Sequence, residues 1–225
     1  MTPARAALAE GWPLLLTSVV IGIPYGVIAR QAGLSVIETS AMSVIVFAGA
    51  AQFAAVELLR SGAGAPVVAL TILLINARHL LMAAALRPFV GGASLVRRLG
   101  LAYILTDEAF AMGIGHFRRG HRDLSYYTVF GISLWCCWNA GTLAGAVFGA
   151  GVTDPSRFGI DFAITASFAA IVAIGVRHRA DAIVALAAAL VAAALRLGGA
   201  SAVAVVAAGA LAPLVAFALH DEDRR

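Results

Sequence analysis

Six polar residues able to bind a charged solute lie inside long apolar stretches of this sequence. They are Asn76, Arg78 and His79 in one stretch and Thr106, Asp107 and Glu108 in the next. In a membrane segment, a charged group at the centre costs about 2.5–3.5 kcal/mol, so a chain retains it where fold or function uses it. An acid or an imidazole here can take and release a proton beside a guanidinium that sets its pKa. We therefore treat these residues as the candidate site for a substrate or an ion.

The spacing within each group limits how a helix can carry it. Asn76 and His79 are three residues apart and share one helix face, whereas Arg78 points elsewhere. The consecutive polar residues 106–108 fan over more than half of a helix circumference, so no lipid-facing orientation hides them all. We predict that the backbone there is broken or fully surrounded by protein. The plainer alternative is that Arg78 and Asp107 form only an interhelical clamp.

A further polar pair, Gln52 and Glu57, lies in the preceding apolar stretch. The two residues are five positions apart, so their directions differ by about 140° and they share a narrow face only if the helix is broken between them. Both are candidate site residues. The alternative for Glu57 is that it lies with Arg60 near the end of its stretch, where both side chains snorkel to the headgroups.

Helix-breaking residues interrupt the first apolar stretch near its middle, at Gly22, Pro24 and Gly26. Pro24 removes one backbone donor and leaves an upstream carbonyl without its helical partner. Unwound backbone at this depth offers carbonyls to a cation and a half-helix N-terminus to a carboxylate. We therefore predict a functional helix break, with a proline kink in a packed helix as the alternative. The GxxxG motif of residues 141–145 indicates close helix packing rather than chemistry.

The composition indicates which elements must position these groups. Of 225 residues, 61% are hydrophobic and 12% are charged, whereas soluble domains average about 45–50% and about 25%. The 16 basic residues are all Arg, and they occur singly or in pairs between apolar runs. This pattern argues against nucleic-acid binding and is typical of membrane topology signals. The adjacent Cys136 and Cys137 lie inside an apolar run, which argues against a disulfide framework.

Apolar runs bounded by charge, Pro or Gly follow one another along the chain. They fall at about 12–30, 36–60, 66–86, 99–117, 126–151, 159–176, 180–197 and 199–219. Runs of this length predict helices, because unpaired backbone groups cannot face lipid and the alternation of a barrel is missing. Since the connections are short, we predict an all-α, polytopic integral membrane helical bundle that forms one transmembrane domain over residues 1–225. The N-terminal residues lack a cleavage signal, so we expect no cleaved signal peptide.

The arginines discriminate between seven and eight transmembrane segments. With Arg78 left aside, they divide nine to six if all eight runs cross, and eleven to four if 99–117 enters and leaves on one side. The stronger bias favours seven crossings. Residues 47–55 match residues 162–170 at six of nine positions, which in the seven-crossing form indicates an inverted repeat. Chance similarity in an Ala-rich chain is the alternative.

Several strings together resemble the AzlC family of branched-chain amino acid permeases. The strings are residues 47–55 (FAGAAQFAA), 74–86 (LINARHLLMAAAL), 105–111 (LTDEAFA), 138–145 (WNAGTLAG) and 159–163 (GIDFA). The combination of N-x-R-H with T-D-E is the most specific feature, and the likeness covers most of residues 20–175. Ala51 and Ala109 depart from the Ser and Thr expected at these positions.

The resemblance implies a secondary transporter of leucine, isoleucine and valine, with methionine as a further candidate. It implies a multi-pass exporter of the bacterial cytoplasmic membrane that is surrounded by lipid. This exporter works with a small AzlD-like membrane subunit. The substrate carboxylate would lie at a half-helix N-terminus or at Arg78, and the ammonium at Asp107 or Glu108. A coupling proton would use Glu108 or His79. Asp161, in the last of the strings, is an additional candidate.

Two other classes of function are alternatives. An intramembrane enzyme would use Cys136 or Ser43 as nucleophile with His79 as base, or hold a metal at His79, Asp107 and Glu108. The sequence contains neither G-x-S-x-G nor H-E-x-x-H. A channel or assembly subunit would use its charges only to fix helix register. No P-loop occurs, so we expect transport driven by a gradient, with no catalytic residues, no cofactor and no metal.

Overall fold

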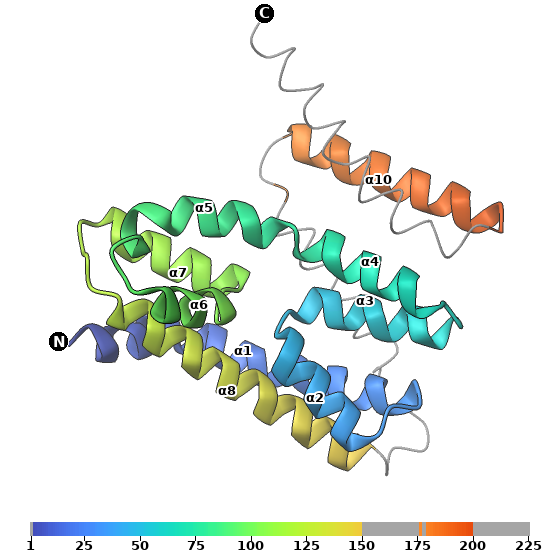
Figure 1. Ribbon diagram of the computed structural model, residues 1–225. Helices are drawn as coiled ribbons and strands as arrows, with labels where there is room; N and C mark the ends of the chain where they lie inside the picture. The colour runs from blue at the N-terminus through green and yellow to red at the C-terminus, as the bar shows by residue number, and fades with distance from the viewer. Residues whose placement is uncertain (1, 150–175, 177–178, 200–225) are drawn as a thin grey trace, which may run out of the picture.

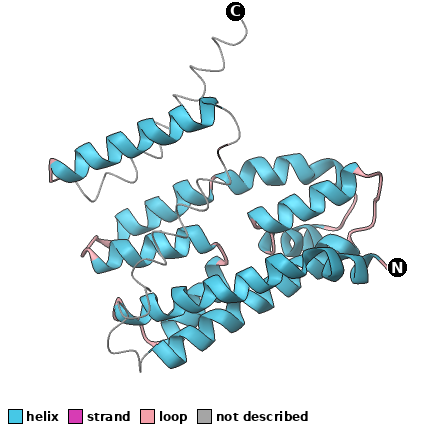
Figure 2. Ribbon diagram, turned by 180° about the vertical axis from the view of Figure 1, so that it is seen from behind, coloured by secondary structure: helices cyan, strands magenta, loops and turns pink. Residues whose placement is uncertain are grey.

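Helices make up the regular structure of the described part of the chain. The computed structural model describes residues 2–149, 176 and 179–199, and helix is their only regular element (Figure 2). The helices are α1 (Pro3–Gln31), α2 (Val36–Val46), α3 (Gly49–Arg60), α4 (Ala65–Asn76), α5 (Arg78–Val90), α6 (Leu95–Tyr103), α7 (Asp107–Arg118), α8 (Ser125–Phe148) and α10 (Arg179–Leu197). The predicted all-α class is confirmed for these residues. Asp161 and residues 162–170 of the predicted repeat lie outside them.

Two segments among the described residues are long and apolar enough to cross a membrane. They are Pro3–Gln31, with 29 residues, and Ala65–Val90, with 26 residues. The most apolar window of the second segment is only 6% buried, so this segment is not the core helix of a soluble domain. Its side chains Leu73, Leu80 and Leu81 are all exposed. An apolar surface of this length is suited to lipid rather than to water.

Helix α1 runs unbroken through Pro24, so the functional break predicted at Gly22, Pro24 and Gly26 is wrong. The two glycines instead pack against the backbone of α8. A Cβ on Gly22 would come within 2.9 Å of the Trp138 carbonyl oxygen, and a Cβ on Gly26 would meet the Thr142 carbonyl. Only glycine allows the two helices to approach this closely.

Helix α8 supplies the complementary glycines of the same interface. A Cβ on Gly141 would meet the carbonyl of Val19, and a Cβ on Gly145 would meet the carbonyl of Ile23. The predicted packing role of the GxxxG motif is therefore confirmed, with α1 as its partner.

Three of the apolar runs are each divided by a break. The breaks separate α2 from α3 at Phe47, α4 from α5 at Ala77, and α6 from α7 at residues 104–106. Phe47 adopts a left-handed backbone at φ 39°, and the Thr106 Oγ accepts a hydrogen bond from the Ala109 amide at 3.2 Å. The prediction of one helix over 36–60 is therefore wrong, whereas the predicted break at the polar residues 106–108 is confirmed.

The short helices form two hairpins that enter the bundle from opposite ends (Figure 1). α2 and α3 have their outer ends where α1 finishes, whereas α6 and α7 have theirs near the N-terminus. α1 and α8 run from one end to the other, as do α4 and α5 taken together. The hairpins meet near the middle of the bundle, where the Tyr103 hydroxyl donates to the Val44 carbonyl.

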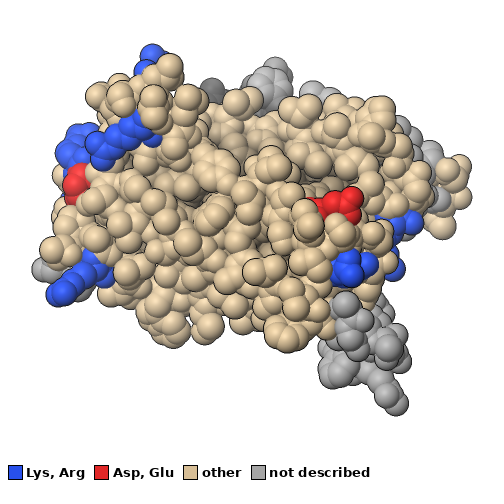
Figure 3. Space-filling model, turned by 60° about the horizontal axis from the view of Figure 1, so that its bottom comes forward, with Lys and Arg blue, Asp and Glu red and all other residues tan. Residues whose placement is uncertain are grey.

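The charged side chains follow this division into two ends. On the face drawn in Figure 3, the charged residues gather toward two sides, and a broad band of other residues separates them. At the N-terminal end Glu10 accepts hydrogen bonds from Arg119 at 3.0 Å and from Tyr126 at 2.8 Å. At the other end Glu38 and Ser35 form a capping box at the start of α2. The uncharged band is the pattern of a lipid-facing surface.

Candidate functional site

A cavity of about 150 Å³ lies where the hairpin tips meet the middles of α1 and α8. Five of the predicted site residues line it, namely Arg78, His79, Thr106, Asp107 and Glu108. Leu14, Ile21, Phe53 and Leu134 are among the apolar side chains of its wall. This volume is about half of the roughly 300 Å³ at which pockets for drug-sized ligands begin. The cavity is therefore suited to a smaller solute, of the size of an amino acid.

Three helix N-termini converge on this cavity, those of α3, α5 and α7. Residues Ala48, Gly49 and Ala50 at the start of α3 line it directly, and no side chain caps this helix. First-turn amides leave their N–H groups unpaired at a helix end that carries a partial positive charge. The start of α3 therefore offers donors to a carboxylate, whereas Thr106 already caps α7.

Arg78, the first residue of α5, and Asp107, the first residue of α7, form an ion pair. The Nη1–Oδ2 distance is 2.8 Å, and the side chains are 36% and 49% exposed. The pair ties the start of α5 to the start of α7 beside the cavity. A fully buried network that also includes His79 and Glu108, as predicted, does not form among the described residues.

Glu108, His79 and the Arg78 Nε are among the groups of this cavity that have bonding capacity left. Glu108 has no hydrogen bond or ion pair to another described residue. The His79 Nδ1 lies 3.0 Å from the Asn76 carbonyl oxygen. Because that carbonyl can only accept, Nδ1 carries the proton and Nε2 of a neutral ring is left as an acceptor. Asn76 is not among the residues that line the cavity, and it contacts His79 through its backbone carbonyl.

Gln52 also lies behind the wall, in contact with a residue that lines the cavity. Its Oε1 accepts a hydrogen bond from the Trp138 Nε1 at 3.1 Å. The Trp138 ring stacks on Tyr25 with 5.8 Å between centroids. Gln52 is fully buried, so its role is to hold this wall rather than to contact a solute directly.

The remaining predicted residues do not reach the cavity. Glu57 lies in the last turn of α3, where its carboxylate is 3.9 Å from Arg60 and its side chain is 56% exposed. This placement fits the snorkelling alternative. Gly22 and Gly26 belong to the interface of α1 with α8.

The side chains that α1 and α8 contribute to the cavity were not among the site residues predicted from the sequence. Thr17 and Ser18 line the cavity from α1, and Trp138 lines it from α8. The available signal was a pair of hydroxyl residues, Thr17 and Ser18, in the middle of the first apolar run. Hydroxyls are common in membrane helices, however, so that signal alone is weak.

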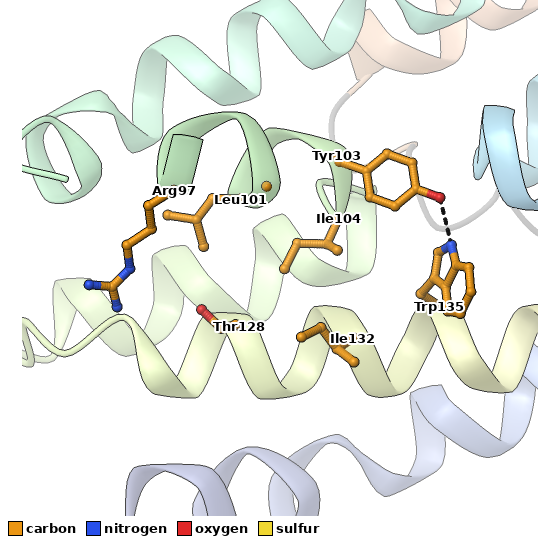
Figure 4. Close-up of a pocket in the computed structure, with 8 residues that line it drawn as sticks. Arg97, Leu101, Tyr103, Ile104, Thr128, Ile132 and Trp135 are labelled. Carbon is orange, nitrogen blue, oxygen red and sulfur yellow. Dashed lines mark hydrogen bonds between the residues drawn. The ribbon is translucent and has the colours of Figure 1, made fainter. Parts of the chain in front are cut away.

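A second, larger cavity of about 470 Å³ lies between α6 and α8 (Figure 4). Arg97 lies toward one end of it and the Tyr103–Trp135 pair toward the other, with Trp135 Nε1 donating to the Tyr103 hydroxyl at 2.8 Å. Its lining is largely apolar and includes no carboxylate, so it cannot match both charges of a zwitterion. The cavity at the hairpin tips remains the better site.

Long exposed apolar helices, an uncharged band on the face drawn in Figure 3 and a central charged cavity define the class of this protein as a helical membrane protein with an internal polar site. The model of the AzlC family, described as "AzlC protein", matches residues 13–152. The chain therefore belongs to the AzlC family, as the resemblance implied.

Named relatives agree with this assignment. The chain is 31% identical over 157 residues to "Inner membrane protein YgaZ" of Escherichia coli, covering 67% of this chain and 64% of the relative. It is 31% identical over 166 residues to "Branched-chain amino acid transport protein AzlC" of Bacillus subtilis, covering 73% and 64%. The match thus spans less than two thirds of either relative. No solved structure matches the chain.

The location predicted from the sequence is confirmed by these findings. One relative is named as an inner membrane protein and another, from Haemophilus influenzae, as a membrane protein. Together with the long apolar helices, they identify the chain as an inner membrane protein.

Proposed function

We propose that this chain is the large subunit of a secondary transporter for branched-chain amino acids. The observation that carries the proposal is the small cavity at the hairpin tips, where an uncapped helix N-terminus, an unpaired carboxylate and apolar side chains meet. These are the groups that a zwitterion with an apolar side chain needs. The name of the Bacillus subtilis relative supports the choice of substrate.

In the proposed arrangement, each polar group of the bound substrate has a partner. Its carboxylate accepts from the first amides of α3, at Gly49 and Ala50, where the helix dipole favours negative charge. Its ammonium lies at Glu108, because Asp107 is already paired with Arg78. The branched side chain rests on Leu14, Ile21 and Leu134 of the wall.

The proposed topology places this cavity halfway across the bilayer. α1, α4–α5 and α8 cross the membrane, while the two hairpins enter it from opposite faces and return. Residues 2–149 then cross three times, whereas the seven-crossing form predicted from the sequence has four crossings there, because 36–60 is a hairpin and not one spanning helix. Between residues 2 and 149, seven arginines then lie at the N-terminal end and two at the other. They are Arg5, Arg87, Arg97, Arg98, Arg118, Arg119 and Arg122 against Arg30 and Arg60. This bias places the N-terminal end in the cytoplasm.

Further parts of the proposal come from the family resemblance. The protein exports its substrate, works with a small AzlD-like membrane subunit and forms one transmembrane domain. A proton taken up by Glu108 or by the free Nε2 of His79 couples transport to a gradient. The family match and the transport protein among the named relatives favour transport over an enzyme.

Counterflow in proteoliposomes that contain this chain and its small partner tests the proposal. We expect saturable exchange of radiolabelled leucine, isoleucine and valine. Glu108→Gln should lower exchange by about 10- to 100-fold, because it removes a charge-assisted hydrogen bond to the ammonium. Asp107→Asn should lower exchange as well, because the Arg78 guanidinium loses its partner and is then free to attract the Glu108 carboxylate.

Glu57→Gln is the matched control, since Glu57 lies at the far end of α3 and pairs with Arg60. It should exchange at the wild-type rate. If Glu108→Gln and Asp107→Asn fold normally and exchange normally, the cavity is not the substrate site. Unsaturable flux would support a channel instead.

A further inference from the structure

A second cluster of ionisable groups lies far from the cavity, at the arginine-rich end of the bundle. His116 lies in the last turn of α7, and His121 and Asp123 follow on the loop to α8. One potential ligand atom from each of the three residues lies within 4.8 Å of the other two. The transport proposal does not use these groups.

The contact between His116 and Asp123 already has the dimensions of a metal site. The His116 Nε2 lies 3.2 Å from the Asp123 Oδ2. In a tetrahedral zinc site with ligand bonds of about 2.0–2.2 Å, neighbouring ligand atoms lie about 3.3–3.6 Å apart. A bound ion would displace the Nε2 proton, which is released to solvent.

The Asp123 carboxylate is oriented by its neighbours. Its Oδ1 accepts from the Ser125 hydroxyl at 2.8 Å and from the Tyr126 amide at 3.4 Å, which leaves Oδ2 for His116. Outer partners of this kind are typical of metal sites.

The third group, His121, is placed to complete the site by a change of its ring orientation. The rings of His116 and His121 stack with 4.3 Å between centroids, and Tyr126 stacks on His116 at 4.0 Å. Tyr126 fixes the His116 ring, whereas His121 is exposed and follows Gly120, whose φ is +94°. His121 can thus turn from the stack and present a nitrogen edge-on to an ion beside His116.

The surrounding charges do not exclude a cation. Arg119 is engaged with Glu10 at 3.0 Å, and the Arg122 guanidinium lies over the Phe89 ring at 5.4 Å. Arg118 is exposed at the end of α7, where water screens its charge. Glu10 adds a negative charge beside Tyr126.

We propose that His116, His121 and Asp123 form a binding site for a divalent transition metal of the Zn²⁺ type. Two imidazoles and a carboxylate match the ligand preference of zinc, and the fourth position remains open to water. The ion ties the last turn of α7 to the start of α8, and so fixes the outer end of the α6–α7 hairpin.

Zinc titration of the purified full chain in detergent micelles tests this site. After removal of metal with a chelator, we expect about one Zn²⁺ per chain and a higher melting temperature with zinc. Co²⁺ should give the visible absorption of a tetrahedral site. His121→Ala and Asp123→Asn should each weaken zinc affinity by at least about 10-fold, the usual effect of disturbing a metal site.

Glu57→Gln, at the other end of the bundle, is the matched carboxylate control and should keep the affinity for zinc. Because His121 is exposed, His121→Ala should melt like the wild type when no metal is present. The proposal is overturned if the wild type binds no zinc. It is equally overturned if His121→Ala and Asp123→Asn both bind zinc as the wild type does.

Discussion

Gln52 shows how a single side chain can hold the wall of the proposed site. It is fully buried, and its Oε1 accepts from Trp138, while its Nε2 has no partner among the described residues. A buried polar group that loses its remaining partner costs about 1–3 kcal/mol. The Trp138–Gln52 contact is therefore a sensitive point of the fold.

Trp138→Phe should lower the free energy of unfolding by about 1–3 kcal/mol, because it leaves Gln52 without its donor. The double variant Trp138→Phe/Gln52→Leu should recover part of that loss, since both polar partners are then removed. Thermal unfolding in micelles measures both. A double variant no more stable than Trp138→Phe would show that the hydrogen bond is not the cause.

At the scale of single residues, the residue types predict some of the contacts of the site but not others. The sequence predicts that Arg78 and Asp107 interact, because two charges at bilayer depth need each other, and their 2.8 Å ion pair is observed. It does not predict that Trp138 reaches Gln52, which lies 86 positions away. Contacts at such separation depend on how the helices pack.

At the scale of elements, the interface of α1 and α8 depends on interlocked glycines. A Cβ at Gly26 would meet backbone atoms of α8, which cannot turn aside as a flexible side chain can. Overpacking of this kind typically costs about 1–3 kcal/mol.

Gly26→Ala should therefore lower the melting temperature in micelles, by an amount that corresponds to about 1–3 kcal/mol. Gly115→Ala on α7 is the matched control, because nothing lies within 4 Å of the added Cβ. It should be neutral or stabilise by up to about 1 kcal/mol through helix propensity. Equal effects of the two substitutions would contradict the close approach of α1 and α8.

The helix breaks were only partly predictable. Three consecutive polar residues predict the break at 106–108, because no single helix face can hide them. The break at Phe47 has no such mark, since it lies among apolar residues of ordinary helix propensity. The break at Ala77 lies between Asn76 and Arg78, but the sequence analysis took the run 66–86 as one helix. At both positions the tertiary packing decides where each helix ends.

At the scale of the whole molecule, the opposed hairpins make a prediction about membrane topology. The connections at 91–94 and 119–124 lie at the N-terminal end, and the connections at 32–35 and 61–64 lie at the other. If both hairpins return to the face they enter from, each face of the membrane exposes one of these sets.

Single cysteines test this after Cys136 and Cys137 are replaced by Ser. Gly92→Cys and Arg122→Cys should react with an impermeant thiol reagent from the cytoplasmic face. Ser61→Cys should react only from the opposite face. Labelling of Gly92→Cys and Arg122→Cys from different faces would mean that the α6–α7 segment crosses the membrane, and the proposed topology would then be wrong.

The sequence by itself determined the membrane environment, the helical class, the family and most of the polar groups of the candidate site. These depend on composition and on local spacing, because burying charge in lipid is costly wherever the chain places it. Tertiary structure alone decided that three helix N-termini, the middles of α1 and α8 and the charged residues share one cavity. It also decided that Gly22 and Gly26 serve packing, and that His116, His121 and Asp123 lie together. The physical reason is that close approach between distant segments depends on side-chain volume and helix crossing, which no local pattern of residues specifies.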